Sequence, residues 1–146
     1  MKGGVRVKFK FVSIVMFLIV IIAGCSSGLE NEEQYIKVNK RIGDENMYEE
    51  FKDITENKQV QQVKQILDEI EWENAKVEMV SPHNFEFMFK YKSPKIDAKS
   101  VLYKIWISPD KDKLEVVRGD SEYGQLNEEN SAVLFEIVTG EKLSDL

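Results

Sequence analysis

The residues of this chain best suited to chemistry are a histidine and a cysteine, each of which occurs once. Nucleophilic hydrolysis needs a base beside a serine, threonine or cysteine. His83 is the single imidazole available as that base, and it lies in Ser81-Pro82-His83-Asn84, whose composition predicts a turn. No nucleophile-elbow motif accompanies it in the sequence. We therefore interpret His83 as a turn residue and expect no catalytic residues.

Carboxylates are the other reactive groups, and the chain has 26 of them. Two acidic loops, one with Asp110 and Asp112 and one with Asp120 and Glu122, offer oxygen ligands suited to calcium. Neither loop has the EF-hand pattern for calcium, which is twelve residues long with a central glycine and a final glutamate. A zinc site would need clustered histidines and cysteines, which the sequence lacks. We expect no metal and no cofactor, while weak cation binding by the acidic loops stays open.

The cysteine follows a short apolar run near the start of the chain. Twelve apolar or nearly apolar residues run from Phe11 to Ile22, fewer than the roughly 20 that a membrane-spanning helix needs. That length suits the apolar region of a signal peptide. The run is preceded by the basic residues Lys2, Arg6, Lys8 and Lys10. The pattern predicts an export signal.

The residues Ile22-Ala23-Gly24-Cys25 resemble the lipobox of bacterial lipoproteins. That resemblance implies cleavage between Gly24 and Cys25 and a diacylglyceryl group on the Cys25 thiol. Residues 1–24 would then be a lipoprotein signal peptide, and the protein would lie on the outer face of the cytoplasmic membrane, held there by its N-terminal lipid. An ordinary signal peptide with an incidental cysteine and an uncleaved N-terminal anchor are the alternatives.

Composition limits the partners of the exported part. Removing residues 1–24 leaves 122 residues with 16 basic and 26 acidic side chains, a net charge of −10 against −6 for the whole chain. A nucleic-acid-binding domain would need a basic patch, so we expect no nucleic acid as a partner. We also expect anionic lipid headgroups and polyanionic wall polymers to repel so acidic a domain.

The chain after the signal divides into a tether and one domain. Residues 25–33, CSSGLENEE, are small, polar and acidic, which predicts a lipidated, flexible tether. Residues 34–146 form a single domain that starts with a strand over 34–40. Residues 48–55 are a second strand or extended arm, although apolar residues spaced three apart also allow a helical turn. A helix follows over 57–72, capped by Asn57 or Thr55, with an inner face of Val60, Val63, Ile66, Leu67 and Ile70.

Beyond this helix the apolar period changes from 3.6 to 2, which predicts strands over 76–80, 85–91, 101–107 and 114–117. A second helix begins after Asn127 and stops at Gly140, with an inner face of Val133, Leu134, Ile137 and Val138. Short connections between consecutive strands favour antiparallel pairing. We therefore predict an α+β fold, a single antiparallel sheet of about five or six strands with two helices packed on one face.

The uncovered sheet face is the candidate interaction surface. Trp106 alternates with Tyr103, Ile105 and Ile107, so it points to the opposite face. If the helices cover one face, the other is either solvated or bound to something. Met88, Leu102 and Trp106 would then be a possible interaction surface, because exposed apolar patches mark binding sites. The alternative is a second layer formed by Tyr48 to Thr55 folding over that face.

A second resemblance covers about Tyr35 to Leu143. The pattern FKDIT, VQQVKQIL, NFEFMF, YKIWI and SAVLFEIV is similar to a small uncharacterised lipoprotein domain, called YhfM-like, of low-GC Gram-positive bacteria. It implies a fold but no reaction. Our hypothesis is a lipid-anchored binding module for a protein, peptide or cell-wall component. A hydrolase with an unrecognised carboxylate pair, or an inhibitor or immunity-type partner of an exported enzyme, are the alternatives.

Overall fold

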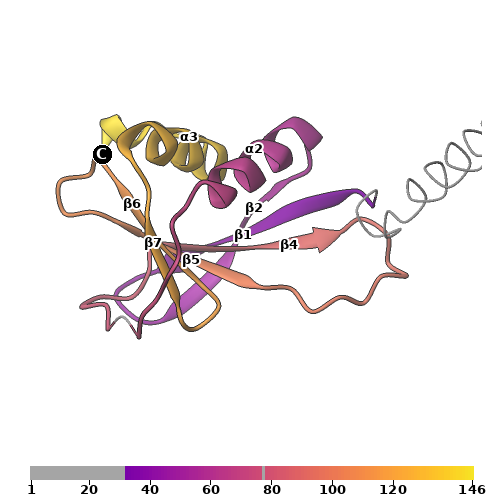
Figure 1. Cartoon of the computed structure of the whole chain (residues 1–146), viewed down its shortest axis with the longest axis horizontal. Helices are drawn as coiled ribbons and strands as arrows, with labels where there is room; N and C mark the ends of the chain where they lie inside the picture. Colours follow the sequence, from indigo (N-terminus) through magenta and orange to yellow (C-terminus); the bar gives the residue numbers. More distant parts are fainter. Residues whose placement is uncertain (1–31, 77) are drawn as a thin grey trace, which may run out of the picture. The chain divides into compact units, whose positions relative to one another are not determined.

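The structure is a computed structural model that describes residues 32–76 and 78–146. Within these residues the chain forms one seven-stranded antiparallel sheet and two α-helices (Figure 1). The predicted α+β class with a single antiparallel sheet is confirmed, but the predicted five or six strands were too few. The sheet order is β2-β1-β4-β5-β6-β7-β3. The elements are β1 (Gln34–Ile42), β2 (Met47–Ile54), α2 (Asn57–Asp68), β3 (Glu73–Asn74), β4 (Phe85–Tyr91), β5 (Leu102–Ile107), β6 (Leu114–Arg118), β7 (Glu122–Gln125), α3 (Glu128–Thr139) and a 3₁₀ turn (Leu143–Asp145).

The strand prediction was wrong at one edge of the sheet. In the predicted strand over 76–80, the described residues lie outside any strand. The edge is formed instead by the two-residue β3, which pairs with β7. β7 was not predicted because Glu122, Gly124 and Gln125 give it no apolar alternation. Gly124 is required there because the methyl group of Ile70 fills the space that a side chain would occupy.

Both helices lie on the same face of the sheet (Figure 1). The predicted inner face of α2 is buried, but the helix ends at Asp68 rather than at residue 72. Its N-cap position is Glu56, which makes no side-chain capping bond, so the predicted cap was wrong. In α3 the Asn127 side chain accepts a hydrogen bond from the backbone N–H of Asn130, as an N-cap does. Gly140 ends this helix in the left-handed conformation, with φ of 82°.

The buried core lies between the helices and the sheet. Its strand residues alternate along β1, β4 and β5, where Ile36, Val38, Phe87 and Ile105 are almost fully buried. The core cluster reaches from Ile36 to Leu143, so residues 33–146 form a compact unit that contains its own core. A unit with its own core is expected to fold without the preceding residues.

Candidate functional site

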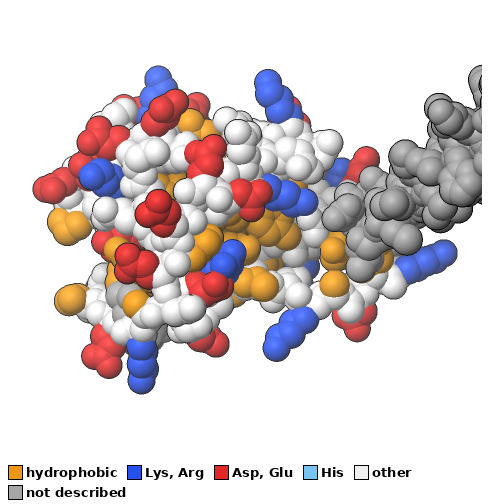
Figure 2. All heavy atoms as spheres, viewed as in Figure 1, with side chains coloured by type: hydrophobic (Ala, Val, Ile, Leu, Met, Phe, Trp, Pro, Cys, Tyr) orange, Lys and Arg blue, Asp and Glu red, His pale blue; other side chains and the backbone are white. Residues whose placement is uncertain are grey.

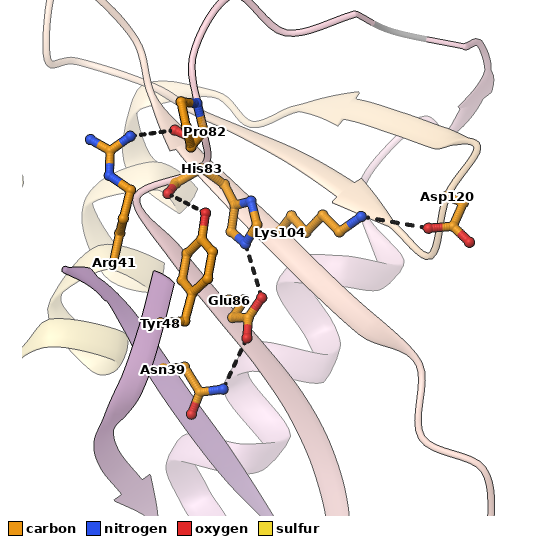
Figure 3. Close-up of polar contacts among 8 residues, drawn as sticks. All are labelled: Asn39, Arg41, Tyr48, Pro82, His83, Glu86, Lys104 and Asp120. Carbon is orange, nitrogen blue, oxygen red and sulfur yellow. Dashed lines mark hydrogen bonds and ion pairs between the residues drawn. The ribbon is translucent and has the colours of Figure 1, made fainter. Parts of the chain in front are cut away.

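A loop crosses the sheet face opposite the helices. We call Met79–His83 the covering loop. The Trp106 indole N–H donates to the Ser81 carbonyl at 2.8 Å, and the Arg41 guanidinium donates to the Pro82 carbonyl at 2.9 Å. The Tyr48 hydroxyl donates to the carbonyl of His83 at 3.0 Å, completing a series of three consecutive carbonyls (Figure 3). The donors come from β5, β1 and β2, so three strands hold this loop in one position.

The His83 side chain packs inside this arrangement. Its ring stacks on Tyr48, with centroids 4.2 Å apart, and meets the Trp106 ring edge-on at 5.3 Å. Its Nε2 lies 2.9 Å from a carboxylate oxygen of Glu86, whose other oxygen accepts from the Asn39 amide at 2.9 Å. The Glu86 carboxylate can only accept, so we assign the Nε2 hydrogen to the neutral ring.

Burial governs the ionisation of this cluster. It lowers the pKa of His83 and outweighs the Glu86 carboxylate, which favours the protonated ring. Lys104 and Arg41 lower the same pKa further. Burial also raises the pKa of the Tyr48 phenol, with a smaller contribution from Glu86. The histidine is therefore neutral near pH 7 and holds the loop as a hydrogen-bond donor.

Beside the covering loop is an open depression of about 470 Å³. Its apolar lining consists of Met79, Val80, Pro82, Trp106 and Val117, and its polar lining of Asn46, Ser81, His83, Lys104 and Asp120. Trp106 and Val117 are buried, whereas the Val80 side chain is fully exposed to solvent. The Lys104 ammonium lies 3.5 Å from the Asp120 carboxylate, and that carboxylate is 99% exposed. A depression that combines apolar residues with polar groups and one ion pair is suited to binding an apolar side chain next to polar groups.

The predicted interaction residues separate in the structure. Met88 and Leu102 lie directly opposite each other on β4 and β5 and are half-buried. Trp106 is on the same sheet face but is only 9% exposed, because the covering loop lies over it. Only Trp106 lines the depression. The alternative second layer from Tyr48 to Thr55 was wrong, since nearly all of that segment is β2 beside β1.

Sequence reasoning missed the covering loop and with it Val80 and Lys104. One signal was present, because a tryptophan on a sheet strand needs an acceptor for its indole N–H. The acceptor proves to be the Ser81 carbonyl, 25 positions away along the chain. His83 lies in a loop, as its neighbours predicted.

Two carboxylates of the acidic loops form hydrogen bonds within the protein. Asp112 accepts from the Ser108 hydroxyl at 2.8 Å, and Glu122 forms two hydrogen bonds of 2.6 Å with Arg118. That arginine lowers the pKa of the Glu122 carboxyl. Across residues 32–76 and 78–146, no three histidine, aspartate or glutamate side chains are grouped so that they could hold a metal ion.

The residues predicted to carry the lipid lie outside the described part of the chain. These are the signal peptide 1–24, the cleavage site at Gly24 and Cys25, and the tether up to residue 31. In the part that is described, no helix has the length and apolar character needed to span a membrane.

Comparison of the chain with protein-family models, with curated proteins and with solved structures finds no match. The resemblances to the lipobox and to the YhfM-like domain therefore remain predictions from the sequence.

Proposed function

We propose that this protein is a lipid-anchored extracytoplasmic binding module that recognises a protein or peptide segment at the depression beside the covering loop. The anchor is the lipid predicted on Cys25, which keeps the module at the outer face of the cytoplasmic membrane. The module itself is the compact unit 33–146.

The observation that carries this proposal is the combination of a fixed loop and a fully exposed Val80. Three hydrogen bonds and the His83 stacking hold the loop, so little conformational entropy is lost when a partner binds to it. The loop nevertheless presents Val80 to solvent beside Trp106 and Val117. A rigid surface that exposes an apolar side chain at the rim of a depression with apolar and polar lining favours binding of a partner segment with an apolar group.

The depression supports the hydrolase hypothesis less well than it supports a binding module. A glycosidase needs two carboxyl groups that face each other across a cleft. The acid that lines the depression is Asp120, with a 99% exposed side chain. Glu86 lies nearby but is engaged by His83 and Asn39. An inhibitor or immunity-type role is a special case of the proposed binding function.

Affinity capture with the soluble fragment 26–146 tests the proposal. The fragment and its Val80→Glu variant are incubated with the exported-protein fraction of the source cell. Val101→Glu is the matched control, because Val101 is also an exposed valine but lies in the β4–β5 loop, away from the depression. Burying a valine contributes about 1.5–3 kcal/mol, so its replacement by a charge should lower affinity at least about tenfold.

The expected result is one stoichiometric partner that Val80→Glu loses and Val101→Glu keeps. A partner retained equally by both variants would refute the assignment of the depression. Failure to capture any protein or peptide would count against a binding module of this kind. Thermal unfolding of both variants confirms that neither charge has disturbed the fold.

A further inference from the structure

The loop between β4 and β5 differs in charge from the rest of this acidic domain. The loop Lys92–Val101 carries three lysines and one aspartate, a net charge of +2 in a chain of net charge −6. Lys92, Lys95 and Lys99 are exposed. In Figure 2 blue Lys or Arg side chains project from the lower right of the domain, while red acidic side chains are most frequent in its left part. The charge is therefore unevenly distributed, which the net value conceals.

This basic loop lies where the chain enters the domain. Gln34, the first residue of β1, pairs with Tyr91, the last residue of β4. One residue further, the backbone N–H of Lys92 donates to the Glu33 carbonyl at 2.9 Å, and the Lys92 ammonium lies 3.0 Å from the Glu33 carboxylate. The loop thus starts beside Glu33, only eight residues after Cys25 in the sequence. Eight residues span at most about 29 Å when fully extended.

Apolar side chains accompany the lysines. A notch of about 170 Å³ lies between the end of β4 and the end of the loop. Its lining includes Phe89, Tyr91, Lys99, Val101 and Tyr103. Val101 is 48% exposed. Aromatic and aliphatic side chains beside lysines are typical of surfaces that bind at the membrane–water interface.

We propose that this surface, the loop Lys92–Val101 with Tyr91, binds the anionic phospholipid headgroups of the membrane to which the chain is tethered. The lysines contact the phosphates, and Tyr91 and Val101 enter the interface. This inference rests on the proposed lipid anchor for its setting, since a tether of this length holds the loop close to the bilayer at high effective concentration. It departs from the expected repulsion, because the loop carries three lysines against Asp97, with Glu33 paired to Lys92, although the domain as a whole is acidic.

Vesicle binding by the fragment 26–146, which lacks Cys25, measures this contact without the lipid. The probes are vesicles of phosphatidylglycerol mixed with phosphatidylcholine and vesicles of phosphatidylcholine alone, compared at low ionic strength and at 0.5 M salt. We expect binding to the anionic vesicles only, and its loss at high salt because exposed charges are then screened. Equal binding to both vesicle types, or to neither, would overturn the proposal.

Charge variants locate the contact. Each lysine near an anionic surface strengthens binding about fivefold, so replacing Lys92, Lys95 and Lys99 by glutamine should weaken it about a hundredfold. The matched control replaces Lys111, Lys113 and Lys142 by glutamine, because these residues follow β5 and α3 at the opposite end of the sheet. We expect the control variant to bind vesicles within about threefold of the unchanged fragment. If it binds as weakly as the loop variant, the contact does not lie in the β4–β5 loop.

Two further experiments distinguish binding to a bilayer from binding to other partners. The first measures binding of the fragment to inorganic polyphosphate in solution. If polyphosphate binds as tightly as the vesicles do at equal phosphate concentration, the surface recognises phosphate polyanions in general, and its assignment to the bilayer is wrong. Val101→Glu should weaken vesicle binding and leave partner capture intact, whereas Val80→Glu should do the reverse. The two variants therefore distinguish a failure of the membrane contact from a failure of partner binding at the depression.

Discussion

Replacement of Gly124 by alanine tests how β7 closes against the end of α2. A Cβ atom placed at residue 124 would lie 2.2 Å from the Cγ2 methyl of Ile70. That methyl is attached directly to the branched Cβ, so it cannot move without a change in a stiff χ1 angle. Ile70 is only 9% exposed and has little space to move into.

The expected magnitude follows from two opposing effects. Overpacking a filled site costs about 1–3 kcal/mol. Replacing a strand glycine by alanine returns about 0.4–1 kcal/mol by restricting the unfolded chain. We therefore expect Gly124→Ala to lower the free energy of unfolding by about 1–2 kcal/mol. In an Ile70→Ala background the clashing methyl is gone, and the same substitution should become neutral or stabilising.

Urea unfolding of the fragment 26–146 provides the assay, with the double-mutant cycle measured at constant m-value. The coupling between positions 70 and 124 should reach at least about 1 kcal/mol. If Gly124→Ala lowers the free energy of unfolding equally in both backgrounds, the steric reasoning is refuted, because the loss of stability would then come from the backbone. Gly124→Ala that stabilises the unchanged fragment would refute the packing itself.

Two other predictions concern the covering loop and the anchor. Burial lowers the pKa of His83, so the unfolded chain takes up the proton first, and the free energy of unfolding should fall as the pH decreases through the ordinary histidine pKa of about 6.5. Urea midpoints between pH 7.5 and 5.5 measure this, and because His83 is the only histidine, a slope that persists in His83→Gln would show that another group is responsible. Cys25→Ala should abolish fatty-acid labelling and release the protein or stall its processing, and labelling that persisted in this variant would exclude Cys25 as the acceptor.

Local periodicity predicted most of the elements correctly. The alternation of Phe85, Phe87 and Phe89 identified β4, and the two helices were found because their inner faces repeat every three to four residues. The cap at Asn127 and the stop at Gly140 were also predicted, because each depends on a hydrogen bond or a backbone angle within a few residues. Such features are local, so a short stretch of sequence contains the information that they need.

The edge of the sheet was predicted poorly because its strands depend on partners. β3 has two residues, and β7 has Gly124 where an apolar residue would ordinarily appear. Neither carries an alternating pattern of its own. The stretch over 76–80 has that pattern, but its described residues lie outside the sheet, where β3 takes the position beside β7.

The sequence by itself determined the α+β class and the core faces of both helices, and lipid attachment at Cys25 stays a prediction from it. Only the tertiary structure placed Ser81 over Trp106, brought His83 onto Tyr48 and Glu86, and left Val80 exposed beside the depression. It alone set the lysines of the β4–β5 loop beside Glu33, at the point where the chain enters the domain. Apart from the contact between His83 and Glu86, these contacts join residues 25 to 59 positions apart, and no local pattern encodes them, because their partners meet only after the strands have paired.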